Sequence, residues 1–468
     1  MPRTSAASSA DVLVIGGGAA GTLTATALAR STSLGRPIRL TVVEPAADLG
    51  RGVAYAHTHD FRLNVPAGAI SASADDRDHF LRWLEARQPG AGRTSFATRA
   101  EFGRYLAATL DDALARAGSA VSFQHVRRGA AATEASDAGV RVRLDDGSTI
   151  EATAVVVATG LQPPGTAWAP EPLRDSSRFV ADPWAPEALD LLADAAPPGD
   201  LADVLLVGTG LTAIDLALLL DRPGRNVHAI SRRGRLPRAH STKALSGVPT
   251  DVAEFQARMR DGVAAAPATA DGIADTVSAS LTDGARRFAS WQWVLDGVRP
   301  ITQQTWQRLP VAERAALVRR HGAWWEVHRH RMPPEVATRV ALMRSAGRLT
   351  VSAAEVVGAK PRDGGLAVRL SDGRRIDVAY VVNCTGPRSD PGGLVAQLLD
   401  AGLATPGPLG LGLATEAGRL LDRSGSTAGP LWTLGILRRG ELWESTAIPE
   451  IRVQAQAVAE AVLACLAR

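Results

Sequence analysis

The stretch Asp11-Val-Leu-Val-Ile-Gly-Gly-Gly-Ala-Ala-Gly21 decides the fold of this chain. Its apolar start predicts a buried parallel strand, and its glycines lead directly into a predicted helix over residues 18–30. A second apolar run at residues 38–43 completes a strand-helix-strand unit. Such a unit, with glycines in its first turn, is typical of a dinucleotide-binding domain.

The three spaced glycines of this turn have separate steric roles. Gly16 allows the tight turn, Gly18 lets a pyrophosphate approach the free N–H groups of the helix, and Gly21 lets helix and strand pack closely. Glu44 follows the second strand, where its carboxylate is placed to accept hydrogen bonds from a ribose diol. Together these residues predict a first cofactor site.

The arrangement occurs a second time in the chain. Residues 203–207 form another apolar strand, and the three small positions that follow it are Gly208, Gly210 and Ala213. The next strand ends not in an acid but in Ser231, Arg232 and Arg233. Guanidinium groups and a hydroxyl bind a 2′-phosphate that a carboxylate would repel, so this site favours NADPH over NADH. A solvated arginine pair in a loop is the alternative interpretation.

An internal duplication sets the predicted domain organisation. Each glycine turn is followed by a β-meander, and the meanders end alike in Ala158-Thr-Gly160 and Cys384-Thr-Gly386. We predict an α/β fold with two Rossmann-like dinucleotide-binding domains. The predicted boundaries are a discontinuous first domain at 1–165 and 350–468, an NADPH domain at 166–248, and a helical, tryptophan-rich insertion at 249–349 that is a candidate substrate region.

Composition narrows the function classes. The net charge is +4 and the basic residues form no block, which argues against nucleic-acid binding. The sequence contains no run of 18 apolar residues, so we predict no membrane-spanning helix. The first ten residues lack the apolar region of a signal peptide, so we expect a cytoplasmic protein. The only two cysteines, Cys384 and Cys465, lie far apart, which excludes a dithiol redox centre and a cysteine-rich metal site. The sequence is compatible with a homo-oligomer.

The order of these elements resembles the two-dinucleotide-binding-domain flavoproteins, which include the glutathione-reductase-fold enzymes and the flavin monooxygenases. The resemblance covers nearly the whole chain and implies FAD in the first site. It also implies that the Thr-Gly segments, with Thr159, Gly160 and Gly386, mark the crossings between domains.

Five segments give a narrower resemblance to a bacterial FAD/NAD(P)-binding family, which is similar to flavin-dependent N-monooxygenases acting on the amine of L-aspartate. They are Gly50–Tyr55, Leu63–Pro66, Ser231–Gly234, Trp324–Arg331 and Gly440–Arg452. This resemblance implies that Arg51, Asn64 and Val65 lie against the flavin, and that Gly435 and the start of the last helix face its pyrimidine end. For Asn64, an ordinary turn asparagine is the alternative.

A departure from related enzymes limits the reaction class. Baeyer–Villiger and N-hydroxylating monooxygenases carry a Phe-x-Gly-x-x-x-His signature before their second glycine turn, whereas this chain has Phe179-Val-Ala-Asp-Pro-Trp184. The missing glycine and histidine argue against a Baeyer–Villiger enzyme and leave monooxygenation open.

Candidate substrate residues cluster at residues 324–331. On a helix, Trp325, His328 and Arg329 share a face, and an arginine fork suits an anionic substrate. The candidates for catalysis or substrate contact are Asn64, Arg329, His330 and Glu444, with Arg438 and Arg439 beside the last of these. The alternative is a packed helix whose arginines pair with acids. We predict no metal site, because His328 and His330 diverge on a helix.

The leading hypothesis is an NADPH-dependent FAD monooxygenase that uses dioxygen to N-hydroxylate a small, anionic amine such as an aspartate-like amino acid. A flavin reductase that passes electrons from NADPH to another acceptor remains open. A dinucleotide-binding redox sensor is the non-enzymatic alternative.

Overall fold

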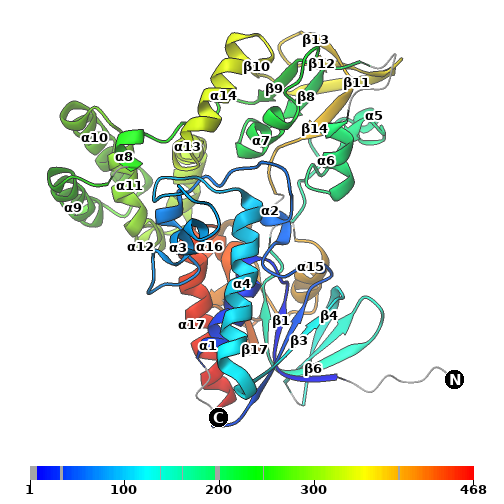
Figure 1. Ribbon diagram of the computed structural model, residues 1–468, viewed down its shortest axis with the longest axis vertical. Helices are drawn as coiled ribbons and strands as arrows, with labels where there is room; N and C mark the ends of the chain where they lie inside the picture. Colours follow the sequence, from blue (N-terminus) through cyan, green and yellow to red (C-terminus); the bar gives the residue numbers. More distant parts are fainter. Residues whose placement is uncertain are drawn as a thin grey trace.

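The computed structural model describes residues 8–31, 35–137, 139–160, 162–194, 201–245, 247–387 and 391–467. The expectation of no signal peptide concerns residues that lie mostly outside these ranges. Within them, none of the helices combines the length and apolarity that a membrane span requires. Figure 1 shows two sheet-containing parts, one above the other, with a group of helices beside them.

A parallel sheet surrounds the strand that precedes the first glycine turn. β1 (Ser8–Ile15) lies between β2 (Ile38–Val43) and β6 (Thr149–Val157). Its central residues Val12–Val14 are fully buried, because both faces of the sheet are covered. The strand order is β15-β16-β17-β6-β1-β2-β3, with β3 (Val121–Val126), β15 (Thr415–Glu416), β16 (Arg419–Leu421) and β17 (Thr427–Thr433), and the hairpin of β4 (Ala130–Ser136) and β5 (Gly139–Leu144) pairs with β6.

Three long helices cover one face of this first sheet (Figure 1). They are α1 (Ala19–Arg30), α4 (Arg99–Ala117) and α17 (Ile448–Leu466), and they share one apolar core with the sheet. α4 begins at a capping box, in which the Thr98 side chain accepts from the Glu101 N–H and the Glu101 carboxylate accepts from the Thr98 N–H. The opposite face packs against the β4–β5 hairpin and α15 (Gly393–Asp400).

A second, fully parallel sheet follows the second glycine turn. Its order is β10-β9-β8-β14-β7. Helices cover one face, and a small antiparallel sheet covers the other. The strands are β7 (Phe179–Val180), β8 (Val204–Val207), β9 (Val227–Ser231), β10 (Leu349–Ala353) and β14 (Tyr380–Asn383); the helices are α6 (Pro186–Ala193), α7 (Leu211–Leu219) and α14 (Pro334–Ser345); the small sheet is β11 (Val356–Arg362), β12 (Gly365–Leu370) and β13 (Arg375–Val378).

This topology corrects the predicted domain boundaries. Residues 350–387 were assigned to the first domain, but β10 pairs with β9 and β14 pairs with β8, so this segment completes the second sheet. The apolar stretch 378–382 is divided at Ala379, whose N–H donates to the Asp203 carbonyl, and the chain there leaves the small sheet for the parallel one. α14, assigned to the insertion, packs on α7 instead.

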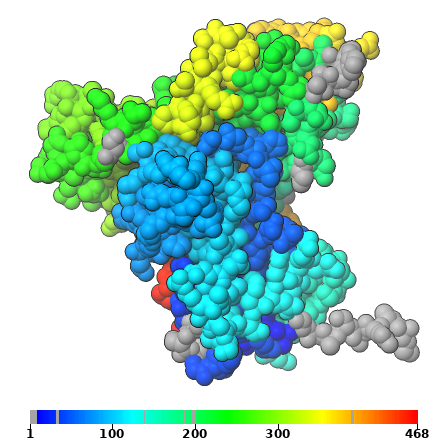
Figure 2. Space-filling model, in the orientation of Figure 1, coloured from blue at the N-terminus to red at the C-terminus, as the bar shows by residue number. Residues whose placement is uncertain are grey.

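The helical insertion therefore ends near Arg329 rather than at residue 349. Figure 1 shows its helices beside the two sheets, and Figure 2 shows α9 and α10 as a protruding green lobe. Its helices are α8 (Thr242–Leu245), α9 (Thr250–Ala265), α10 (Ala270–Phe288), α11 (Gln292–Val298), α12 (Thr302–Arg308) and α13 (Val311–Arg329); the remaining short helices of the chain are α2 (Gly52–Tyr55), α3 (His79–Glu85), α5 (Glu171–Arg174) and α16 (Arg439–Leu442).

The two sheet-containing parts contact each other at several points. The segments that follow the two Thr-Gly sequences lie side by side, with an isolated antiparallel bridge between Pro164 and Pro387. Arg99 at the start of α4 binds Asp215 of α7, with 2.7 Å between guanidinium and carboxylate. Burial raises the pKa of Asp215 to about 6.

Candidate active site

The first glycine turn has the backbone geometry that the sequence predicts. Gly16 has φ of +102°, and a Cβ there would lie 2.4 Å from the Ala158 carbonyl oxygen. A Cβ on Gly21 would lie 1.8 Å from the Gly16 carbonyl oxygen, so both positions exclude side chains. Gly18 is the N-cap of α1 and has no side chain to cap the helix. The first N–H groups of α1 are therefore free for an anion.

Glu44 lies directly over this turn. Its carboxylate accepts hydrogen bonds from the Gly17 N–H at 2.7 Å and from the Ala46 N–H at 3.1 Å. These bonds fix the carboxylate beside the glycines and leave it lone pairs for a ribose. Thr159, in the Thr-Gly segment below the turn, has a buried hydroxyl with no hydrogen-bond partner in the described structure. The steric cradle and this unsatisfied hydroxyl fit a bound FAD.

The second glycine turn repeats the first in detail. Gly208 has φ of +116°, and a Cβ there would lie 2.1 Å from the Cys384 carbonyl oxygen, just as Gly16 meets Ala158. Gly210 is the N-cap of α7, and nothing lies within 4 Å of the position of its Cβ. Ala213 is buried where a larger residue would separate helix from strand. The same steric solution therefore serves both turns.

The three predicted phosphate ligands at the end of β9 differ in whether they already have partners. Ser231 is already engaged, since its hydroxyl lies 2.9 Å from the Thr209 hydroxyl and accepts from the Gly234 N–H at 3.0 Å. Arg232 and Arg233 are exposed and make no ion pair within the described part of the chain. The guanidinium groups are thus available to a 2′-phosphate, whereas the serine shapes the turn.

The residues expected at the flavin lie on three loops. Arg51 caps α2 and pairs with Asp48 at 3.2 Å. The Asn64 carbonyl accepts from His240 Nε2 at 2.9 Å, which ties the loop with Val65 to the chain after the second cofactor turn. Gly435 has φ of +71°, and its N–H donates to the Gln454 side chain at 2.8 Å. Gly160 and Gly386 also have positive φ, where the chain leaves each sheet.

A polar cavity of about 390 Å³ opens beside the start of α17. We call it the arginine pocket. Gly68 and Ala69 line it just after the Asn64 loop, and the insertion contributes another wall. Its polar lining residues are Arg77, Arg299, Gln303, Glu444, Glu450 and Arg452.

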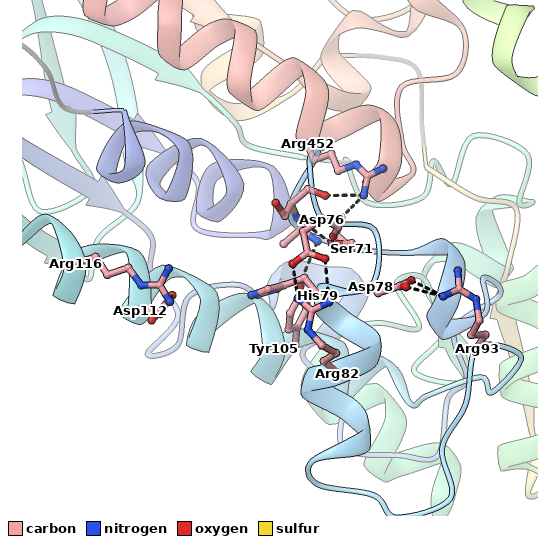
Figure 3. Close-up of polar contacts among 12 residues, drawn as sticks. Ser71, Asp76, Asp78, His79, Arg82, Arg93, Tyr105, Asp112, Arg116 and Arg452 are labelled. Atoms are coloured by element: carbon pink, nitrogen blue, oxygen red, sulfur yellow. Dashed lines mark hydrogen bonds and ion pairs between the residues drawn. The ribbon is translucent and has the colours of Figure 1, made fainter.

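The charges in the arginine pocket do not cancel. Arg299 is neutralised by Glu450, with guanidinium–carboxylate distances of 2.8–3.1 Å. Arg452 donates only to the carbonyls of Ser71 and Ser73, as Figure 3 shows, and its Nε is buried without a partner. Burial, then the nearby Arg77, lowers the pKa of Arg452. Arg77 is exposed and forms no ion pair with any described residue. Two guanidinium groups are left to attract an anion.

The loop that carries Arg77 is firmly held (Figure 3). Asp76 pairs with Arg82, and Asp78 pairs with Arg93 at 2.7 Å. The Tyr105 hydroxyl accepts from the Ala72 N–H at 3.0 Å. The acids on either side of Arg77 are therefore occupied by other arginines, which leaves its own charge uncompensated.

Glu444 brings two predicted substrate residues together. Its carboxylate accepts from Trp325 Nε1 at 3.2 Å and from Arg329 at 3.0 Å. Arg329 and Glu444 have side chains only 11% and 9% exposed, so this is a buried pair rather than an arginine paired with a surface acid. Glu444 remains part of the pocket wall.

The other members of the predicted cluster have different partners. His328 stacks on Trp324, with ring centroids 4.2 Å apart. His330 Nδ1 lies 2.7 Å from Glu326. Arg438 pairs with Glu441 at 2.7 Å, and Arg439 reaches Glu326 at 3.3 Å. No group of three or more His, Cys, Asp or Glu side chains suited to a metal ion occurs among the described residues.

The comparisons with known proteins agree with this geometry. Residues 13–162 match the model of the FAD-NAD(P)-binding family. The matched residues include the first glycine turn, Glu44 and the first Thr-Gly segment. The comparison with curated proteins gives no match.

Solved structures show the same fold over the whole chain. Ornithine hydroxylase from Pseudomonas aeruginosa is 15% identical, with 98% of this chain and 100% of that chain covered and a TM-score of 0.63. L-lysine 6-monooxygenase from Pseudomonas syringae is also 15% identical, with coverage of 97% and 99% and a TM-score of 0.64. Bacillithiol disulfide reductase from Staphylococcus aureus is 12% identical, with coverage of 98% and 99% and a TM-score of 0.56. The chain therefore has the two-dinucleotide-binding flavoprotein fold, which hosts more than one reaction.

Proposed function

We propose that this chain is an NADPH-dependent FAD monooxygenase that N-hydroxylates a small anionic amino acid of the aspartate type. The observation that carries the proposal is the arginine pocket, with two uncompensated guanidinium groups beside the start of α17. Bound FAD would supply the electron transfer and oxygen activation, and the protein would position the reactants.

The proposed cofactor contacts follow the two glycine turns. The N-terminus of α1 and Glu44 would hold the pyrophosphate and ribose of FAD, and the N-terminus of α7 would hold the pyrophosphate of NADPH. Arg232 and Arg233 would bind the 2′-phosphate. Their exposure and lack of partners support this role, since neither has to break an ion pair first.

The proposed substrate contacts are in the arginine pocket. Arg77 and Arg452 would bind carboxylate groups, because their charges have no acidic partner in the described structure. Glu444 would attract the ammonium group, since each carboxylate oxygen can accept a further hydrogen bond beside those from Trp325 and Arg329. An amino acid with an extra carboxylate matches this arrangement of charges.

The cysteines argue against the disulfide-reductase activity that this fold also supports. Cys384 is buried and Cys465 is partly buried, and they belong to different parts of the fold. Burial also raises the pKa of Cys384, which disfavours the reactive thiolate. A bound cofactor is therefore the electron carrier in this proposal.

The experiment has an anaerobic and an aerobic step. Flavin bleaching is first measured with NADPH and NADH, and the hydroxylamine formed from L-aspartate in air is then compared with the NADPH consumed. Faster bleaching by NADPH and product formation coupled to NADPH use are expected. The double variant Arg232→Ser/Arg233→Ser should weaken NADPH binding about 10- to 100-fold, as expected from lost charge-assisted hydrogen bonds, and spare NADH.

The alternatives give other outcomes. Bleaching without an N-oxidised product, combined with turnover on a quinone acceptor, would identify a reductase. Absence of bleaching with either nucleotide would favour a sensor. In the monooxygenase, Arg77→Ala should raise the KM for L-aspartate about tenfold and leave bleaching unchanged. Arg93→Ala is the matched control, because Arg93 serves the same loop but does not line the pocket.

A further inference from the structure

The helical insertion carries an apolar cavity that is partly open to solvent. The buried apolar residues of the insertion form two small clusters, one around Phe255 and Val294 and the other around Val263 and Leu309. The cavity, of about 410 Å³, lies between them, and Val277 packs against both. Because of its opening, a small molecule could reach the cavity from outside.

The lining of the cavity is mostly aromatic and aliphatic. Four of the ten tryptophans of the chain, Trp306, Trp324, Trp325 and Trp443, surround the cavity together with aliphatic side chains. No Asp, Glu, Lys or Arg of the described chain lines it, and the polar groups are three hydroxyls and His321. The volume falls within the usual range for small-molecule sites, which are apolar with a few polar groups. This lining suits a neutral aromatic molecule.

The backbone beside the cavity is strained. Trp443 has φ of +60° and ψ of −66°, and the Glu444 N–H donates to the Leu442 carbonyl at 2.8 Å. This is the rare γ-turn with a positive central φ. The turn directs Trp443 toward the cavity, where it stacks on Trp306 with centroids 4.7 Å apart. Strain of this kind in a non-glycine residue persists at sites with a functional constraint.

The cavity is linked to the arginine pocket by one hydrogen bond between their linings. Trp325 lines the cavity and donates to Glu444, which lines the pocket. Trp443, which precedes Glu444 in the sequence, also lines the cavity. A molecule in the cavity would therefore contact both tryptophans that flank Glu444.

We propose that this tryptophan-lined cavity is a second binding site, separate from the cofactor turns, for a neutral aromatic small molecule. The site is distinct from the arginine pocket, because their linings have no residue in common. It does not depend on the reaction proposed above.

The test uses the FAD-loaded protein and the neutral fluorescent probe N-phenyl-1-naphthylamine. Its emission rises in apolar surroundings, and energy transfer from the lining tryptophans reports proximity. Saturable binding of one probe per chain with tryptophan-sensitised emission is expected, and excess NADPH should not displace it. Absence of binding, or displacement by NADPH, would overturn the proposal.

Variants at Gly322 locate the probe. Gly322 lines the cavity on α13, and a Cβ there would have only an ordinary contact, 3.4 Å from Val318. Gly322→Phe should fill the cavity and weaken probe binding about tenfold or more, with a melting temperature at or above that of the wild type. Gly322→Ala is the matched control and should bind the probe normally.

Ala274→Phe fills the same cavity from α10 and serves if the first variant does not fold. Unchanged probe affinity in a folded filling variant would place the probe elsewhere and refute the site.

Discussion

Substitution of Gly210 by alanine separates the role of the second glycine turn in binding from its role in folding. The φ of Gly210 is −79°, which alanine adopts freely, and no atom lies within 4 Å of the new Cβ. The free energy of unfolding should therefore change by no more than about 1 kcal/mol. The methyl group would instead stand where a pyrophosphate approaches the N-terminus of α7.

The expected loss of affinity follows from the contact that the methyl group blocks. A hydrogen bond to a charged group contributes about 1.5–3 kcal/mol, so losing one should raise the Kd for NADPH about 10- to 100-fold. The Kd is measured from the concentration dependence of anaerobic flavin bleaching. FAD content should stay unchanged, because the first turn is untouched.

Gly208→Ala is the contrasting variant. Its Cβ would lie 2.1 Å from the Cys384 carbonyl oxygen at a φ of +116°, so this variant should lose stability rather than affinity alone. If Gly210→Ala folds normally and binds NADPH as tightly as the wild type, the second turn is not the nicotinamide cofactor site.

Three further predictions test other parts of the molecule. Glu444→Gln leaves the buried charge of Arg329 unpaired and should lower the free energy of unfolding by about 3 kcal/mol, and a double-mutant cycle with Arg329→Gln should show strong coupling in chemical denaturation. A thiol reagent should label only Cys465 in the folded chain and both cysteines after denaturation, because Cys384 is buried; fast labelling of two thiols in the folded protein would contradict this. Folding raises the pKa of Asp215 from 3.8 to about 6, so its contribution to the free energy of unfolding is full below pH 3.8 and falls by about 3 kcal/mol as the pH rises through 6. Denaturation curves measured between pH 4 and 7 should show this decline in the wild type and lack it in Asp215→Asn.

The two glycine turns could be predicted from sequence because steric exclusion restricts their first positions to glycine. Gly16 has a positive φ, and a Cβ there would lie 2.4 Å from the Ala158 carbonyl oxygen, so only glycine fits and the position can be recognised in the sequence. The assignment of residues 350–387 was wrong because an apolar strand does not specify its partner. β14 and β6 look alike in sequence, and only the fold shows that they belong to different sheets.

The tryptophan-rich helix was predicted only in part. Trp325 and Arg329 both bind Glu444, whereas the His328 ring lies against Trp324 and Trp291, and these partners could not be read from spacing along the helix. Arg77 was missed because a lone arginine between acids is typical of a solvated turn. Its significance depends on Asp76 and Asp78 being bound to other arginines, which no spacing along the chain indicates.

The arginine pocket explains why the insertion and the repeated domains depend on each other. Arg77 comes from the loop before α3, Arg299 from the end of α11, and Glu444 and Arg452 from around the start of α17. Arg299 is held by Glu450, so the insertion is attached to the first domain at the pocket itself. The cofactor turns are built from contacts within each domain, whereas the pocket exists only where three distant segments meet. We therefore expect changes in the insertion to alter which molecule binds, and changes in the glycine turns to alter whether electrons are transferred at all.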